Sequence, residues 1–326
     1  MTKIAVLGAG AWGTALAIQA ARAGRAVALW ARDPDRAAAI AQARENTRYL
    51  PGAPLPDAVA VTADASAALA GAALALMVVP AQALGRVLAS LPVQDVPLLV
   101  CAKGVEAGTL RLPLEIVAAL RPGLRAGVLS GPNFAHEVAR GLPAASVVAA
   151  ADPALRAAGV TLLATPGFRL YEGEDAIGAE VGGAAKNVIA IAAGAVIGAG
   201  LGENARAALV TRGLAEMARL VVALGGRAET ASGLSGLGDL LLTCSGTGSR
   251  NMSLGMALGR GERLADVLAA RAGVTEGVAT APAIVARAAA AGVEMPICAA
   301  VADLVADRIT VPEAMGRLLA RPLRAE

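Results

Sequence analysis

The sequence Ile4-Ala5-Val6-Leu7-Gly8-Ala9-Gly10-Ala11-Trp12-Gly13 lies almost at the start of the chain and decides the fold. Its first four residues are apolar and predict a buried strand. Residues 11–23 have the pattern of a helix, which Gly24 is suited to end. A second apolar run at residues 27–30 predicts the next strand. Strand, helix and strand in this order predict a βαβ unit in a parallel sheet.

Gly8, Gly10 and Gly13 have the spacing G-x-G-x-x-G. The spacing alone is weak in a sequence rich in Gly and Ala, and a plain turn is the alternative, but here it follows a strand and opens a helix. Gly8 permits the tight turn, Gly10 the approach of a pyrophosphate, and Gly13 close packing of helix on strand, with phosphates at the helix N-terminus. The context therefore predicts a Rossmann-type dinucleotide site.

The choice of cofactor is expected to depend on the residues that follow the second strand. A site for NAD usually has Asp or Glu there, to bind the ribose 2′-hydroxyl. Here Arg32 occupies the place and is able to pair with a 2′-phosphate, although it is also explained as a solvated surface charge. Asp33 precedes Pro34 and is better explained as a helix N-cap. The sequence favours NADP(H), with NAD(H) as the alternative.

Later segments divide the chain into two regions. Further apolar runs predict strands covered on both faces, at residues 74–79, 98–101, 127–129 and 146–149. After the acidic segment 172–175 the patterns become helical, at residues 179–197, 205–224, 264–271, 280–291 and 295–306. We therefore predict an α/β protein: an N-terminal Rossmann-type parallel-sheet domain over residues 1–176, followed by an all-helical substrate and catalytic domain over residues 177–326.

The composition raises the question of a membrane protein, because 56% of the residues are hydrophobic and the mean hydropathy is +0.60. A spanning helix needs ~20 continuous apolar residues. The uncharged run 65–85 is interrupted by Gly71 and Pro80, which predicts helix, turn and strand, and the run 187–202 is shorter and rich in glycine. The sequence therefore predicts a buried helix at 187–202 and no stable membrane insertion.

Charge and cysteine content indicate a cytoplasmic protein. No secretory leader is evident, and Cys101, Cys244 and Cys298 are odd in number and far apart, as expected of reduced thiols. The net charge of +3 comes without basic blocks, which argues against a nucleic-acid partner. His136 is the single histidine, so a cluster of histidine metal ligands is excluded. An enzyme of this composition would use Lys, Asp or Glu as its proton donor.

Three polar segments stand out in apolar surroundings. Lys103 follows the predicted strand 98–101, at the edge where open α/β sheets bind ligands. Lys186 lies on a helix of Ala, Val, Ile and Gly, where burial lowers the pKa of a lysine; a surface lysine is the alternative. The glycine-rich segment 233–239, together with residues 249–251, is typical of an anion site.

Eight blocks in order make the sequence similar to the bacterial NAD(P)-dependent glycerol-3-phosphate dehydrogenases over nearly its whole length. The blocks are residues 8–15, 46–52, 102–104, 130–135, 186–187, 236–240, 249–251 and 276–277. The resemblance implies reversible reduction of dihydroxyacetone phosphate to sn-glycerol 3-phosphate, which supplies phospholipid synthesis. It also implies a homodimer and a phosphorylated triose as the small-molecule substrate.

The resemblance also assigns roles to single residues. Lys186 matches the proton donor and acceptor. The positions that match substrate contacts are Lys103, Gly131, Asn133, Lys186, Asp239, Ser249, Arg250 and Asn251. The positions on the cofactor side are Gly8, Gly10, Ala11, Trp12, Gly13, Arg32, Tyr49, Lys103, Ala135, Arg250 and Glu276. The sequence departs from the family pattern at Ala11, where Ser is common, and at Asn133, where Ser or Thr is common.

Hydride transfer to a ketone leaves negative charge on its oxygen, and Lys186 is able to stabilise that charge and to donate a proton. Asn187 and Asp239 are candidates to orient Lys186, and Lys103 to add positive charge. Two alternatives remain open at this point. One is a 3-hydroxy-acid dehydrogenase of the same two-domain build, which would not need residues 249–251 as a phosphate site. The other is a non-catalytic NADP-binding sensor, which has no need of Lys103, Lys186 and Asp239 together.

Overall fold

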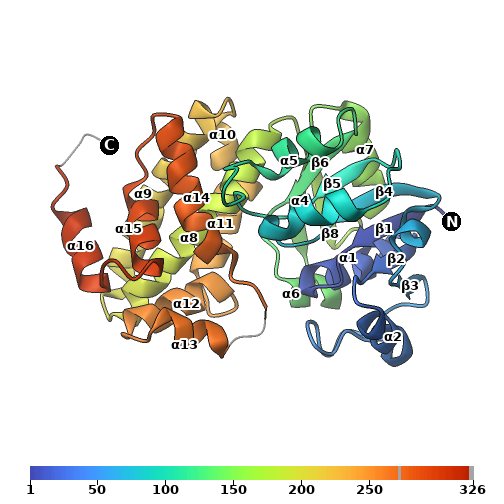
Figure 1. Cartoon of the computed structure of the whole chain (residues 1–326), viewed down its shortest axis with the longest axis horizontal. Coiled ribbons are helices and arrows are strands. Elements are labelled where there is room, and N and C mark those ends of the chain that lie inside the picture. Colours follow the sequence, from blue (N-terminus) through green and yellow to red (C-terminus); the bar gives the residue numbers. More distant parts are fainter. Residues whose placement is uncertain (271–272, 323–326) are drawn as a thin grey trace. The chain divides into compact units, whose positions relative to one another are not determined.

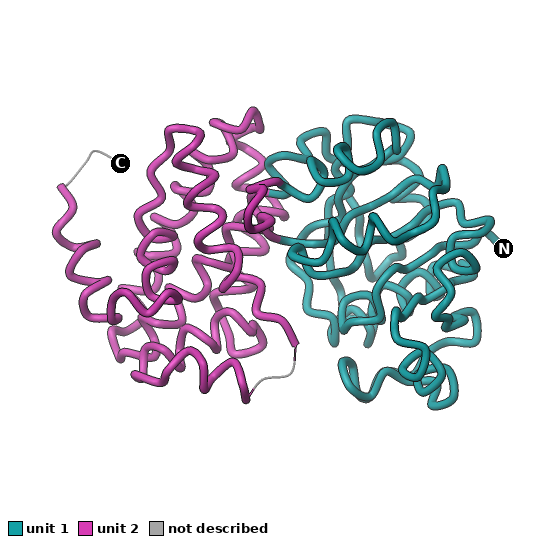
Figure 2. The backbone as a smooth tube through the Cα atoms, in the orientation of Figure 1, with its two compact units in different colours: residues 1–103, 112–180 teal, residues 104–111, 181–326 magenta. Residues whose placement is uncertain are grey.

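The computed structural model describes residues 1–270 and 273–322. The chain divides into two compact units, one of residues 1–103 and 112–180, the other of residues 104–111 and 181–326 (Figure 2). The short segment 104–111 leaves the first unit and joins the second, and the chain returns to the first unit at Leu112. The predicted domain boundary after residue 176 remains a prediction.

The first unit is built on an eight-stranded sheet with the order β3-β2-β1-β4-β5-β6-β7-β8 (Figure 1). The strands are β1 (Lys3–Leu7), β2 (Ala26–Trp30), β3 (Val59–Thr62), β4 (Ala72–Met77), β5 (Leu98–Val100), β6 (Ala126–Ser130), β7 (Ala144–Ala149) and β8 (Phe168–Gly173). Each apolar run named as a strand forms one. The strand order reverses at β1, which has β2 on one side and β4 on the other, as in doubly wound dinucleotide-binding sheets.

The sheet is predominantly parallel, as predicted, and contains one antiparallel pairing. β6 pairs with β7 in the antiparallel sense, whereas the other neighbouring strands are parallel. The connection from Ser130 to Ala144 contains only the six-residue helix α6 (Ala135–Arg140). A parallel pairing needs a crossover connection that brings the chain back to the end of the sheet at which the first strand began. This connection instead enters β7 from the same end at which β6 finishes.

Both faces of the sheet are buried at its central strands, which explains why β1, β2, β4 and β5 are apolar without alternation. Along β1, Ile4 and Val6 belong to one core cluster and Ala5 and Leu7 to the other. The first cluster includes residues of α1 (Ala11–Arg22), α6 and α7 (Pro153–Leu163). The second includes residues of α3 (Ala65–Leu69), α4 (Ala81–Ser90) and α5 (Pro113–Leu120). The remaining helix of this unit is α2 (Pro34–Ala43).

The described part of the second unit is helical, as the sequence predicts. Its long helices are α8 (Ala176–Gly198), which starts in the first unit, and α9 (Gly202–Ala223). The others are α10 (Ala228–Ala231), the π-helix η1 (Leu234–Gly238), α11 (Asp239–Cys244), α12 (Arg250–Gly259), α13 (Leu264–Ala269), α14 (Glu276–Ala290), α15 (Pro296–Val305) and α16 (Val311–Leu319). Arg271, the last residue of the predicted helix 264–271, lies outside the described residues.

α8 is long and apolar enough to span a membrane by length and composition alone. However, 78% of its most apolar window is buried inside the protein, which fits the predicted core helix. Its closest packing is against α12, through glycines spaced by four on each helix: Gly194 and Gly198 on α8, Gly255 and Gly259 on α12. A β-carbon at Gly194 would lie 2.8 Å from the backbone nitrogen of Met256, and one at Gly255 would lie 2.9 Å from that of Ala195. The two backbones therefore touch directly.

Candidate functional site

The glycine segment between β1 and α1 has the geometry of a phosphate cradle. Gly8 has φ +124°, and a β-carbon there would lie 2.9 Å from the carbonyl carbon of Val78. A β-carbon at Gly13 would lie 3.0 Å from the carbonyl carbon of Gly8, so only glycine lets α1 pack on this turn. Around Gly10 there is open space instead. Gly10 is the N-cap of α1 and provides no side-chain cap, and the first turn holds no acidic residue. These residues fit a dinucleotide pyrophosphate.

Asn46, buried next to the cradle, holds its shape. Its Nδ2 donates hydrogen bonds to the carbonyl oxygen of Ala9 at 3.0 Å and to Oγ1 of Thr14 at 2.7 Å. The Thr14 hydroxyl donates in turn to the carbonyl oxygen of Gly10 at 2.8 Å. Asn46 lies in one of the blocks shared with the family, but no role was predicted for it. Its type gives no sign of one, because the contact spans 37 residues of sequence.

The end of β2 presents the residues expected to choose the cofactor. Arg32 is exposed. Asp33 is the predicted N-cap of α2: its carboxylate accepts from the backbone N–H groups of Asp35 and Arg36 at 3.0 and 3.3 Å. One turn into α2, the guanidinium of Arg36 donates to the carbonyl oxygen of Ala9. The sequence analysis did not single out Arg36.

A second group of predicted residues lies at the ends of β5 and β6. Lys103 Nζ donates to the carbonyl oxygen of Gly131 at 3.1 Å. Gly131 has φ +153°, and a β-carbon there would lie 2.8 Å from Cα of Ser146. Asn133 donates through Nδ2 to Oγ of Ser146 at 2.6 Å, while its buried Oδ1 has no hydrogen-bond partner. Ala135 is the first residue of α6. The structure therefore brings Lys103, Gly131 and Asn133 together in the first unit.

Lys186 is at the centre of the polar group in the second unit. It is 9% exposed, and its Nζ lies 2.6 Å from Oδ1 of Asp239, which is 1% exposed. The same Nζ donates to Oγ1 of Thr243 at 3.0 Å, and that hydroxyl donates to the carbonyl oxygen of Asp239 at 2.6 Å. The surface-lysine alternative is thus wrong. Thr243 was missed because its role requires α11 to place it one turn after Asp239.

Asn187 and Asn251 form a second network beside this pair. Asn251 Nδ2 donates to Oδ1 of Asn187 at 2.9 Å, and Asn251 Oδ1 accepts from the N–H of Gly277 at 3.0 Å. Asn187 Nδ2 reaches the carbonyl oxygen of Gly183 at 3.3 Å. The amide of Asn251 therefore joins α8 to the first turn of α14, where Glu276 is the first residue.

The N-terminus of α12 carries the other predicted anion ligands. Ser249 is its N-cap and accepts from the N–H of Met252 at 3.2 Å. Arg250 is exposed, and its guanidinium lies against Gly273, where a β-carbon would be 2.8 Å from Nη1.

The glycine-rich segment 233–239 does not form the backbone anion loop suggested by its sequence. The N–H groups of Gly236 and Gly238 both donate to the carbonyl oxygen of Gly233, at 3.3 and 3.0 Å. A β-carbon at Gly236 would lie 2.7 Å from Cα of Ala231, and one at Gly182 would lie 3.1 Å from the carbonyl carbon of Ser235. The glycines instead allow η1 to pack tightly on α10 and α8, which presents Asp239 to Lys186.

Burial also governs the titratable groups near these networks. Desolvation raises the pKa of the Cys244 thiol to about 12, with the Lys186 charge opposing the shift, so Cys244 is a buried thiol as expected. Desolvation raises the pKa of Glu180 to about 8, against the hydrogen bond that its Oε1 accepts from the N–H of Leu114 at 2.7 Å. The neighbouring Glu115 raises it further. His136 is exposed.

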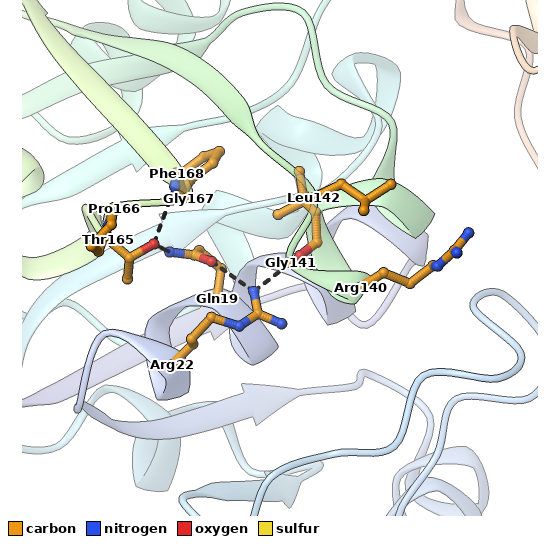
Figure 3. Close-up of a pocket in the computed structure, with 10 residues that line it drawn as sticks. Gln19, Arg22, Arg140, Gly141, Leu142, Thr165, Pro166, Gly167 and Phe168 are labelled. Carbon is orange, nitrogen blue, oxygen red and sulfur yellow. Dashed lines mark hydrogen bonds between the residues drawn. The ribbon is translucent and has the colours of Figure 1, made fainter.

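A pocket of about 430 Å³ lies at the opposite end of α1 (Figure 3). Arg22 donates there to Oε1 of Gln19 at 2.9 Å and to the carbonyl oxygens of Val138 and Ala139. Gln19 Nε2 donates to the carbonyl oxygen of Leu163 at 3.0 Å and to Oγ1 of Thr165 at 3.1 Å. These contacts tie α1 to α6 and to the segment before β8. The side chains of Gln19, Arg22 and Thr165 are thus engaged in holding the first unit together.

Comparison with known proteins places these features in one family. The model described as "NAD-dependent glycerol-3-phosphate dehydrogenase N-terminus" matches residues 3–156, and the corresponding C-terminus model matches residues 175–316. A glycerol-3-phosphate dehydrogenase [NAD(P)+] of Acidiphilium cryptum is 57% identical, over 99% of this chain and 98% of the relative. One of Rhodospirillum rubrum is 54% identical, over 99% and 93%.

A solved structure agrees with the sequence comparisons. The crystal structure of glycerol-3-phosphate dehydrogenase from Coxiella burnetii has a TM-score of 0.94 and 39% identity, over 98% of this chain and 99% of that one. The match covers nearly the whole of both chains. The chain therefore belongs to the NAD-dependent glycerol-3-phosphate dehydrogenase family.

Proposed function

We propose that this oxidoreductase interconverts dihydroxyacetone phosphate and sn-glycerol 3-phosphate with a nicotinamide dinucleotide. The observation that carries the proposal is the buried pair of Lys186 and Asp239, with Nζ and Oδ1 2.6 Å apart. A buried ion pair contributes little net stability compared with well-packed apolar residues. Its presence is more readily explained by the need for a positioned proton donor.

Lys186 donates the proton in the direction of ketone reduction. A nicotinamide dinucleotide held by the glycine cradle would supply the hydride for the carbonyl carbon, and the carbonyl oxygen would then carry negative charge. The ammonium of Lys186 stabilises that charge and transfers a proton to the oxygen; in the reverse direction the neutral amine accepts it. Asp239 and Thr243 accept hydrogen bonds from Nζ and fix its position. Asn187 lies next to Lys186 on α8 and contributes to the same polar group.

The substrate phosphate is assigned to the start of α12. Ser249 caps this helix, Arg250 offers a planar guanidinium that matches phosphate bidentately, and Asn251 is fixed by Asn187 and Gly277. The resemblance to the family further assigns substrate contacts to Lys103, Gly131 and Asn133. The hydrogen bond from Lys103 to Gly131 and the unpartnered Oδ1 of Asn133 support treating these three as one group.

The dinucleotide is assigned to the cradle of the first unit. Gly8, Gly10, Ala11, Trp12 and Gly13 would hold the pyrophosphate at the N-terminus of α1. The other proposed cofactor-side residues are Arg32, Tyr49, Lys103, Ala135, Arg250 and Glu276. NADP(H) is the proposed preference, supported by a basic rather than an acidic residue after β2 and by the use of the Asp33 carboxylate as a helix cap.

Three further proposals follow from the family. The domains are residues 1–176 for the dinucleotide and residues 177–326 for catalysis. The product supplies glycerophospholipid synthesis in the cytoplasm. The protein is a homodimer, which sedimentation equilibrium of the purified chain would test directly.

The test of function is oxidation of NADPH and NADH with dihydroxyacetone phosphate and with unphosphorylated dihydroxyacetone. The phosphorylated ketone should have by far the higher kcat/KM. Comparable turnover of both ketones would rule out the phosphate site.

The role of Lys186 is tested by Lys186→Met, which should lower kcat by about 10²- to 10⁴-fold. The sequence contains only two other lysines, and Lys3 supplies the matched control. Its Nζ binds the carbonyl oxygens of Ala67 and Ala70 in the first unit, so Lys3→Met should keep parental kcat. Near-parental kcat in Lys186→Met would remove this lysine from the mechanism.

A further inference from the structure

Two arginines and one tyrosine form a cationic cluster beside the glycine cradle. The guanidinium of Arg36 lies over the ring of Tyr49 at 4.2 Å from the centroid, and that of Arg48 lies at 5.3 Å. In the described part of the chain, neither arginine forms an ion pair with a carboxylate. Desolvation lowers the pKa of Arg36, and the like charge of Arg48 lowers it further, while Tyr49 and the Asp33 carboxylate oppose the shift. The cluster therefore has the charge to receive an anion.

Arg36 is bound to the cradle itself. Its Nη2 donates to the carbonyl oxygen of Ala9, the residue between Gly8 and Gly10 that Asn46 also holds. Its Nε is buried and has no hydrogen-bond partner. Desolvation is the largest cause of the lowered pKa of this side chain. A buried donor without a partner is costly, and an anion that accepted from it would offset the cost.

The two other charged residues near the end of β2 are less well placed for this task. Arg32 is exposed, and its side chain forms no hydrogen bond with the cradle in the described part of the chain. The Asp33 carboxylate is bound by two backbone N–H groups and caps α2. A nucleotide that lies on the cradle has its adenosine ribose near the end of β2, since the acidic residue that binds the 2′-hydroxyl in NAD sites is found there. Arg36 connects this place to the cradle.

We propose that Arg36, supported by Arg48 and stacked on Tyr49, is the main residue that binds the ribose 2′-phosphate and sets the preference for NADP(H). The proposal rests on the proposed function, because it takes the cradle to be a dinucleotide site. It differs from the sequence-based prediction, which gives this role to Arg32. The planar guanidinium suits the task, since it keeps its stacking on Tyr49 while presenting donors at its edge.

The first measurement is calorimetric binding of two nucleotide fragments, adenosine 2′,5′-bisphosphate and adenosine 5′-monophosphate, which differ only in the 2′-phosphate. Arg36→Ala should weaken binding of the bisphosphate by about 10- to 100-fold, as expected for loss of a charged hydrogen bond. It should change binding of the monophosphate less than threefold. Arg32→Ala should have a smaller effect on the bisphosphate than Arg36→Ala. Arg36→Lys should recover only part of the loss, because it keeps the charge without the planar fork.

The matched control is Arg169→Ala, which removes another arginine that lies over a tyrosine, Tyr171 on β8, at 5.8 Å. It should bind both fragments like the parent. Equal weakening of both fragments by Arg36→Ala would show that Arg36 only supports the cradle and would overturn the proposal. So would a larger loss of bisphosphate binding in Arg32→Ala.

Steady-state kinetics separates this proposal from the proposed function. A parent that reduces dihydroxyacetone phosphate, with Arg36→Ala lowering kcat/KM for NADPH but not for NADH, supports both. If the parent is active and the ratio of kcat/KM for NADPH to kcat/KM for NADH is the same in Arg36→Ala, the proposed role of Arg36 is wrong and the proposed function stands. If the parent binds the bisphosphate through Arg36 but does not turn over dihydroxyacetone phosphate, the proposed role of Arg36 is supported and the proposed function is refuted.

Discussion

Gly255→Ala tests whether the direct contact between α8 and α12 holds the catalytic unit together. The added β-carbon would lie 2.8 Å from the carbonyl carbon of Ile191 and 2.9 Å from the nitrogen of Ala195, and closer still to the oxygen of Ile191. A methyl carbon needs about 3.4 Å or more to its neighbours, so the shortfall is about 0.5 Å even at the two farther atoms. All three atoms are helix backbone and have no rotamer to change.

The helices must therefore separate along the whole contact. A gap of 0.5–1 Å forfeits roughly a quarter to a half of the dispersion energy between the facing atoms. With the added strain, the cost should be at least about 1–3 kcal/mol. This corresponds to a melting temperature lower by roughly 3–10 °C. Lys186 and Arg250 lie on the two separated helices, so kcat/KM for dihydroxyacetone phosphate should fall as well.

The assay is thermal unfolding followed by circular dichroism, with kinetics on the same preparations. The control is Gly316→Ala on α16, where an added β-carbon meets nothing within 4 Å. That helical glycine should gain about 0.5–1 kcal/mol from alanine. A Gly255→Ala protein with parental melting temperature and activity would refute the close-packing argument. An equal loss in both variants would show that the effect is not due to the contact.

Two further predictions follow from buried polar groups. The pKa of Glu180 is raised to about 8, so its protonated form contributes stability that is complete below the unfolded pKa near 4.5 and is lost as the pH rises through 8. Glu180→Gln keeps an acceptor for the N–H of Leu114 and should be more stable than the parent at pH 9.5 by up to roughly 3–5 kcal/mol. A difference in melting temperature between the two proteins that stayed constant from pH 6 to 9.5 would contradict this. Thr243→Val removes one hydrogen-bond acceptor of Lys186 and should lower kcat by about 5- to 30-fold with little change in melting temperature. An unchanged kcat would show that Thr243 contributes only to packing.

The first unit was largely predictable because its signals are local. The glycine spacing, the cap at Asp33 and the apolar runs each depend on a few neighbouring residues. β3 (Val59–Thr62) and β8 (Phe168–Gly173) were missed because both are edge strands with partly exposed patterns, and neither forms a continuous apolar run. The antiparallel β7 was missed because strand direction depends on how the connection through α6 returns, which apolar patterning does not encode.

The polar groups were predictable in residue type but not in arrangement. Lys186 stood out because a lone lysine in an apolar helix needs a partner, and Asp239 was a candidate for it. The glycines of residues 233–238 indicated a phosphate-binding loop. In the structure they permit close packing instead, and only the tertiary contacts with Ala231 and Gly182 distinguish the two uses. Asn46 and Arg36 were missed for the same reason, since each acts on Ala9 from a distant part of the sequence.

Glycine is thus used in two physically different ways, at Gly10 in the cradle and at the contact between α8 and α12. In the cradle, Gly10 leaves space where a pyrophosphate would lie, and a side chain there would compete with the ligand. Between α8 and α12, glycines leave no space, and a side chain would compete with helix backbone. Substitution at Gly10 should therefore weaken nucleotide binding while stability is kept, whereas substitution at Gly255 should lower both stability and turnover. The high glycine content, which weakened the motif as a sequence signal, reflects both of these requirements.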